Sequence, residues 1–268
     1  MDLLRQYLVA VQFFTRVPVT GPLAQWADWS PEQLRASAAH FPGVGWLVAL
    51  VACMAFALLG VVLHGSVFVP LVAAIGCTIA TLLLTGAFHE DGLADVADGL
   101  GGSAGREQAL AIMKDSRLGT YGVVAVAMAL LMKVALLAVL GGQSAAGVLV
   151  ALFAAHTVSR FAPLVVTSRL PYIGDESTSK SKPLADRIGK RELWIAAMWC
   201  VPPLALAVVV RGFAFAIFGV LLVAAAWWAM QRLFVRRLQG FTGDCLGATQ
   251  QVCEIAFYLG AAIAFAFG

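Results

Sequence analysis

The stretch from 89 to 122, HEDGLADVADGLGGSAGREQALAIMKDSRLGTYG, gathers carboxylates in a chain where charge is scarce. Of the 268 residues, 61% are hydrophobic and only 12% are Asp, Glu, Lys or Arg. If Asp91, Asp95 and Asp98 lie on one helix, steps of about 100° per residue place all three within an arc of about 60°. Carboxylates that close repel one another unless a cation neutralises them. The spacing therefore predicts a divalent-metal site with these three residues as ligands.

Basic residues follow the acids in the same stretch. Lys114 and Arg117 flank Asp115, and Arg106 precedes them. Cations beside an acidic metal site suit a substrate with phosphates, because the metal bridges carboxylate and phosphate oxygens while the cations neutralise the remaining charge. We expect Asp115 to serve both the metal and the catalytic step, and Arg106, Lys114 and Arg117 to contact phosphate. The alternative is a turn whose basic flanks only set membrane topology.

Three further groups are candidates for the same site. The proton acceptor is either His89, which titrates near neutrality, or Glu90. Lys180 and Lys182, amid Ser and Thr, could clamp a phosphate, although a solvated loop would look the same. Asp244 stands between two glycines just before the last apolar run, where it either caps a helix or joins the substrate site. We favour the site for Asp244.

The elements that must position these groups are membrane helices. The mean hydropathy of +0.87 exceeds what a soluble core requires. Apolar windows of about 20 residues predict spans, and in hydrocarbon such spans must be helices because backbone groups find no other partner. The sequence predicts an all-α, polytopic membrane bundle of about seven transmembrane helices. They are expected near 44–63, 67–88, 119–139, 146–167, 193–210, 213–231 and 249–267.

Basic residues also predict the orientation of the bundle. Of the 18 Lys and Arg residues, 15 fall in the first 43 residues or in the loops 89–118, 168–192 and 232–248. This asymmetry places those loops in the cytoplasm. Residues 1–43 are expected to form an interfacial segment that begins with an amphipathic helix. We predict one membrane-embedded domain over 1–268, with 89–118 as its catalytic cytoplasmic loop.

Two cations fall inside predicted spans. Arg160 lies one helical turn from His156, and a charge within the membrane is a functional hypothesis by default. Lys133 lies deeper, and the sequence identifies no partner for it.

Four ordered motifs carry a resemblance to a known family. FFTRVPV at 13–19, GAFHEDGLADVADG at 86–99, IMKDSRLGTYG at 112–122 and FTGDCLGA at 241–248 resemble the cobalamin synthases, the adenosylcobinamide-GDP ribazoletransferases. The resemblance implies a Mg²⁺-dependent, multi-pass enzyme of the bacterial inner membrane. It would join adenosylcobinamide-GDP to α-ribazole or α-ribazole 5′-phosphate, release GMP, and form adenosylcobalamin or its 5′-phosphate. The expected partners are these small molecules and the lipid bilayer, with no nucleic acid; homo-oligomerisation is left open.

A second, partial resemblance points to related transferases. The DxxDG at 95–99 is similar to part of the CDP-alcohol phosphotransferase signature, but the chain departs from it at Gly102-Ser103 and at Gly119. These departures argue against a phospholipid synthase. A membrane prenyltransferase would show two Asp-rich motifs of comparable strength, and only one is clear. A transporter, the remaining alternative, predicts polar residues at the bilayer midplane rather than at one surface.

Overall fold

The computed structural model describes residues 2–27, 30–102, 105–174 and 188–267. Within these ranges the regular elements are helices, apart from an isolated bridge between Tyr172 and Phe241. The helices are α1 (Asp2–Phe14), α2 (Pro22–Ala27), α3 (Pro31–Ser37), the 3₁₀ turn η1 (Ala38–His40), α4 (Phe41–Val62), α5 (Val69–Thr85), α6 (Phe88–Gly101), α7 (Arg106–Met113), α8 (Thr120–Gln143), α9 (Ala145–Arg169), α11 (Lys190–Arg211), α12 (Phe213–Arg237) and α13 (Gly243–Phe267).

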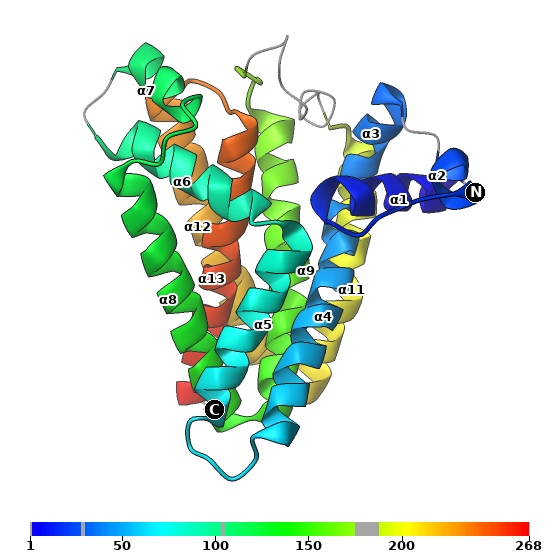
Figure 1. The fold of residues 1–268 in the computed structure, drawn as a ribbon, viewed down its shortest axis with the longest axis vertical. Coiled ribbons are helices and arrows are strands. Elements are labelled where there is room, and N and C mark those ends of the chain that lie inside the picture. The colour runs from blue at the N-terminus through cyan, green and yellow to red at the C-terminus, as the bar shows by residue number, and fades with distance from the viewer. Residues whose placement is uncertain (1, 28–29, 103–104, 175–187, 268) are drawn as a thin grey trace.

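The long apolar helices confirm a polytopic membrane bundle. Five helical stretches of the described chain are long and apolar enough to cross a membrane, and they include α4, α8, α9, α11 and α12. The bent pair of α5 and α6 makes a sixth when it is taken as one span. The predicted count of seven is not confirmed. Helix α13 lies within the bundle (Figure 1), but its sequence is interrupted by Gln250, Gln251 and Glu254.

The chain bends by 90° between α5 and α6, where the sequence predicted the end of one span. Gly86 and Ala87 both have positive φ, at 70° and 57°, and the left-handed conformation at Gly86 ends α5. The Arg16 side chain lies against Gly86, where a Cβ would collide with it. The backbone N–H of Arg16 donates to the Leu84 carbonyl at 2.7 Å. The N-terminal motif thus holds the bend that sends α6 across the end of the bundle.

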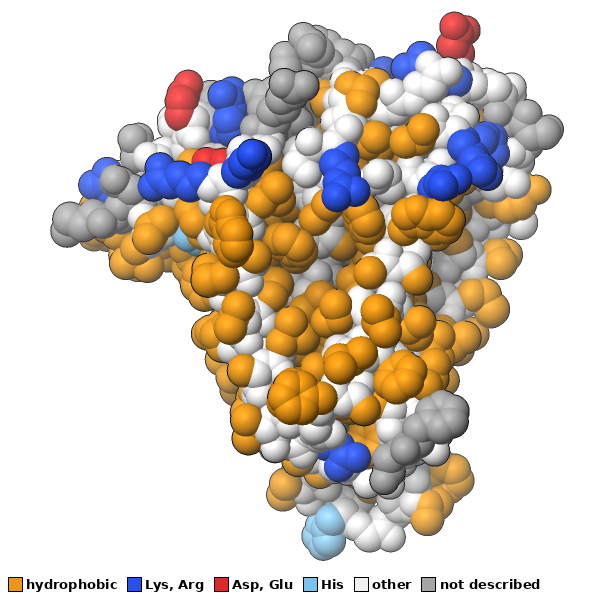
Figure 2. Space-filling view, turned by 180° about the vertical axis from the view of Figure 1, so that it is seen from behind, with side chains coloured by type: hydrophobic (Ala, Val, Ile, Leu, Met, Phe, Trp, Pro, Cys, Tyr) orange, Lys and Arg blue, Asp and Glu red, His pale blue; other side chains and the backbone are white. Residues whose placement is uncertain are grey.

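Charged side chains gather at one end of the molecule. Helices α1, α6 and α7 lie at this end in Figure 1, together with the start of α11 and the connections before α8 and α13. Figure 2 shows Lys and Arg side chains around this end and hydrophobic side chains along the tapered body. The described parts of the charged loops therefore lie at one end of the molecule, as predicted. We call this region the charged end.

Two helices form the interior of the bundle. Helix α9 is buried along most of its length, and α13 packs against α6, α8, α9 and α12. Because α13 begins at the charged end and contacts α6 there, it places the FTGDCLGA motif beside the acidic helix.

Candidate active site

The predicted acidic helix exists, and α13 adds a fourth carboxylate to it. Asp91, Asp95 and Asp98 all lie on α6, and Asp244 lies in the first turn of α13. Helices α6 and α13 approach closely at Gly92, where a Cβ would lie 2.8 Å from the backbone oxygen of Asp244. Small residues allow such contact between helices. The structure thus brings together residues that are about 150 positions apart in the sequence.

Asp95 shows the electrostatic consequence of this arrangement. Burial and, after it, the carboxylates of Asp244, Asp91 and Asp98 together raise the pKa of Asp95 to about 7. A half-buried carboxylate among like charges favours either a proton or a cation. Asp95 is therefore the centre of the acidic cluster, which we define as Asp91, Asp95 and Asp244.

Asp98 has a different position from the other acids. Its Oδ2 accepts a hydrogen bond from the Gly119 N–H at 2.7 Å, and its Oδ1 accepts one from the Gly122 N–H at 2.8 Å. These donors begin α8 and have no partner within that helix. Asp98 therefore caps α8 from another helix and joins α6 to it.

The residues after α7 form a separate exposed turn. Arg117 donates to both carboxylate oxygens of Asp115, at 2.5 Å and 3.0 Å, and this pairing lowers the pKa of Asp115 to about 2. The Arg117 side chain is 88% exposed. Lys114 ends α7, and the Nε of Arg106 donates to the Leu238 carbonyl at 2.6 Å. Lys180 and Lys182 lie outside the described residues.

The two candidate proton acceptors are buried in different surroundings. His89 is 2% exposed and stacks on Phe41, with ring centroids 5.7 Å apart. Its Nε2 has no hydrogen-bond partner within the described part of the chain. Glu90 instead accepts a hydrogen bond from the Nε2 of Gln251 on α13, at 3.0 Å. His89 lines the aromatic cavity beside the acidic residues, whereas the side chain of Glu90 is hydrogen-bonded to α13 inside the bundle.

An aromatic cavity of about 330 Å³ opens beside the acidic cluster. Its walls come from α1, the turn into α4, α6, α9 and the start of α13. Most of the lining is apolar, and Asp91 and Asp244 are its acidic residues. The aromatic and acidic lining residues are Phe13, Phe14, Phe41, Phe88, Asp91 and Asp244. The cavity therefore joins an apolar interior to a charged edge.

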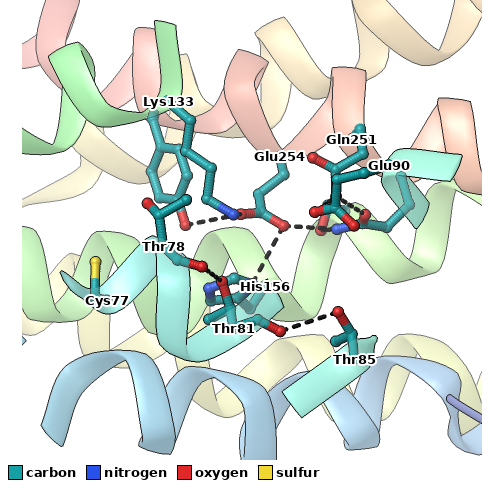
Figure 3. A network of polar contacts seen from close by, with 12 residues as sticks. Cys77, Thr78, Thr81, Thr85, Glu90, Lys133, His156, Gln251 and Glu254 are labelled. Carbon is teal, nitrogen blue, oxygen red and sulfur yellow. Dashed lines mark hydrogen bonds and ion pairs between the residues drawn. The ribbon is translucent and has the colours of Figure 1, made fainter. Parts of the chain in front are cut away.

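A buried polar network lies deeper in the bundle, around Glu254 of α13 (Figure 3). The Nζ of Lys133 lies 2.5 Å from Oε1 of Glu254, and Nδ1 of His156 lies 3.2 Å from Oε2. Gln250 donates to Glu254 at 2.7 Å and Gln251 reaches Glu90, so the network extends to α6. Glu254 is the partner that the sequence did not identify for Lys133. Glu254 is an acidic residue inside a predicted span, and this was the signal from which a buried ion pair could have been predicted.

Arg160 belongs to the same interior region. It is 2% exposed, donates to the His156 carbonyl at 2.8 Å, and lies 5.7 Å from the centre of the Phe41 ring. Phe41 is thus in contact with both Arg160 and His89. The intramembrane arginine is connected to the cavity wall through this ring.

The acidic cluster has the donor chemistry of a magnesium site. Within the described ranges, no three His, Cys, Asp or Glu side chains converge closely enough to form a complete metal site. Asp91, Asp95 and Asp244 nevertheless offer the carboxylate oxygens that Mg²⁺ prefers, and Mg²⁺ usually takes only one or two protein carboxylates beside substrate phosphates.

Comparison with known proteins identifies the family. Residues 6–262 match the family described as cobalamin-5-phosphate synthase. The adenosylcobinamide-GDP ribazoletransferase of Polaromonas naphthalenivorans (strain CJ2) is 55% identical, over 98% of this chain and 99% of the relative. Proteins of that name from Leptothrix cholodnii (strain ATCC 51168 / LMG 8142 / SP-6) and Vibrio vulnificus (strain YJ016) are 43% and 39% identical, over 96% and 94% of this chain and 94% and 93% of the relatives. No solved structure matches the chain. The chain belongs to the cobalamin-5-phosphate synthase family.

Proposed function

We propose that this protein joins adenosylcobinamide-GDP to α-ribazole or α-ribazole 5′-phosphate, releasing GMP and forming adenosylcobalamin or its 5′-phosphate. The observation that carries the proposal is the crowding of carboxylates around Asp95 beside a cavity large enough for a small ligand. Relatives named for this reaction match nearly the whole chain. The match favours this reaction over a prenyltransferase, a CDP-alcohol phosphotransferase or a transporter.

Asp91, Asp95 and Asp244 are the residues that would hold Mg²⁺. When bound, the ion would neutralise the charge of the diphosphate and the charge that develops on the leaving phosphate. This set differs from the one expected from the sequence. Asp98 and Asp115 are left out, because both oxygens of Asp98 accept hydrogen bonds from α8 and Asp115 is paired with Arg117. Asp244, which was expected at the substrate site, is added because it lies beside Asp95.

The basic groups of the charged end suit the nucleotide portion of the substrate. Arg117 is exposed, and its guanidinium can contact a phosphate directly. Arg106 is the first residue of α7, and Lys114 directly follows the last residue of this short helix. We further propose that Lys180 and Lys182, as predicted from the sequence, make additional contacts to phosphate. We also propose that the charged end faces the cytoplasm of a bacterial inner membrane, because the nucleotide-activated substrate is found there.

The reaction transfers the phosphorus that is attached to the cobinamide side. The acceptor hydroxyl of α-ribazole attacks this phosphorus, the bond to the bridging oxygen of the diphosphate breaks, and GMP leaves with the bond electrons. We assign the hydroxyl proton to Nε2 of His89, because His89 lines the cavity and this nitrogen has no partner within the described residues. Glu90, held by Gln251, is the less favoured acceptor.

The test measures GMP release by the purified protein in detergent or lipid, with both substrates and Mg²⁺. We expect release to stop with EDTA and to return when Mg²⁺ is restored. Asp95→Asn should abolish turnover while the protein still inserts into the membrane. Glu107→Gln, which changes an exposed acid on α7, is the matched control and should retain activity. Absence of GMP from the unaltered protein would refute the function, and near-normal turnover by Asp95→Asn would refute the metal assignment.

A further inference from the structure

The aromatic cavity has a chemical character that the acidic cluster does not explain. Phe14 stacks on Phe41 with ring centroids 4.0 Å apart, and His89 stacks on Phe41 at 5.7 Å. Phe88 meets Phe14 and His89 edge-on. Aromatic side chains in these orientations present faces and edges that favour a further flat ring. Phosphates, by contrast, require donors and cations.

From this lining we infer that the cavity is the binding site for the aromatic base of α-ribazole, with the ribose directed toward Asp91 and Asp244. The inference rests on the proposed function, and it concerns which substrate portion occupies which part of the site. The base is a flat bicyclic ring with two methyl groups and no hydrogen-bond donor once it is joined to ribose. Such a group needs apolar contact more than polar partners.

The size and polarity of the cavity exclude the other portions of the substrates. At about 330 Å³, the cavity is at the small end of ligand sites and is far too small for a corrin ring. Guanine carries several donors and acceptors along its edges, and placing them against phenylalanine rings would leave them unpaired. The adenine of the adenosyl group likewise carries an amino donor, whereas the ring of α-ribazole has a suitable size and no donor.

The position of the cavity also fits the order of groups along α-ribazole. His89 stacks on Phe41 and lines the same cavity as Asp91, so the aromatic wall and the acidic edge border one space. A base held against Phe88, the more exposed ring of the wall, would place its ribose toward Asp244 and toward the diphosphate of the second substrate. The FFTRVPV motif contributes Phe13 and Phe14 to the wall, which gives this part of the sequence a role in substrate binding.

Two substitutions in the wall test the inference through the Michaelis constants. Phe88 is 43% exposed, so Phe88→Leu removes one aromatic ring from the cavity wall without leaving a void in the core. We expect the KM for α-ribazole to rise about three- to tenfold, in keeping with the loss of one aromatic contact, and the KM for adenosylcobinamide-GDP to stay unchanged. Phe68→Leu makes the same change at a 66% exposed position away from the cavity and should alter neither constant.

The second substitution adds volume instead of removing it. Ala38 lines the cavity and is 2% exposed, so Ala38→Val narrows the space for the base. We expect this variant to discriminate against the dimethylated base and to bind a riboside of unsubstituted benzimidazole at least as well as the unaltered protein does. This change in preference would not follow from a general loss of folding.

Binding measured without turnover separates this inference from the proposed function. Equilibrium dialysis of labelled α-ribazole is done with the Asp95→Asn protein, with and without Phe88→Leu. Weaker binding with Phe88→Leu supports the cavity assignment even if no GMP is formed. Unchanged α-ribazole binding, or a shift confined to the KM for adenosylcobinamide-GDP, overturns it. Absence of GMP release by the unaltered protein overturns the proposed function instead.

Discussion

Replacing Lys133 with methionine tests whether the buried ion pair stabilises the bundle. Lys133 and Glu254 are 3% and 1% exposed, and their charged atoms are 2.5 Å apart. Lys133→Met keeps most of the side-chain volume but leaves the Glu254 carboxylate without its cation. Breaking one partner of a buried pair costs about 3–5 kcal/mol, because the remaining charge is uncompensated.

The surroundings of Glu254 place the expected loss near the lower end of that range. Gln250 and Tyr258 still donate to the carboxylate, at 2.7 Å and 3.3 Å, and His156 lies 3.2 Å from it. We therefore expect Lys133→Met to lower the free energy of unfolding by about 3 kcal/mol. The double variant Lys133→Met/Glu254→Gln removes both charges and should recover most of the loss.

The assay is reversible unfolding of the purified protein in mixed micelles, followed by circular dichroism. Arg117→Met is a matched control, because it removes the cation of an exposed pair and should leave unfolding unchanged. A loss below about 1 kcal/mol for Lys133→Met, or a double variant as unstable as the single one, would refute the idea that Glu254 depends on this partner.

Two further substitutions probe the supports of the site. A Cβ at Gly122 would collide with the Asp98 carboxylate, so Gly122→Ala should separate α6 from α8 and cost about 1–3 kcal/mol of unfolding free energy. Gly142→Ala, in the same helix with open space around it, should be neutral or slightly stabilising, and equal losses in the two variants would contradict the steric argument. Arg117→Gln should raise the KM for adenosylcobinamide-GDP roughly tenfold, as expected when a charged hydrogen bond to phosphate is lost, without changing the KM for α-ribazole. An unchanged KM for both substrates would remove Arg117 from the phosphate site.

The sequence predicted the helices and the acidic face because both depend on local spacing. Apolar windows identify spans without knowledge of their neighbours. The spacing of Asp91, Asp95 and Asp98 likewise determines that they share one side of α6. Helix α13 is the case in which the same signal weakens, since its buried polar residues interrupt an otherwise apolar helix.

The roles that the sequence could not predict depend on distant partners. Asp98 has the same spacing as its neighbours on α6, but its bonds go to Gly119 and Gly122 at the start of another helix. Lys133 gains its partner from a residue more than 100 positions away. The bend at Gly86 depends in part on Arg16, which lies in a separate motif. Such contacts follow from the packing of the helices and leave no periodic signal in the chain.

Close packing of α6 on α13 explains how the protein holds like charges together. Besides the contact at Gly92, a Cβ at Gly247 would lie 3.2 Å from the backbone oxygen of His89, so a glycine on each helix lies against the backbone of the other. The bond from Gln251 to Glu90 joins the same two helices farther inside the bundle. These contacts oppose the repulsion between carboxylates that, after burial, raises the pKa of Asp95. The stability of the interior therefore maintains an acidic cluster that would otherwise separate, and the cation that we propose for this site would relieve that repulsion.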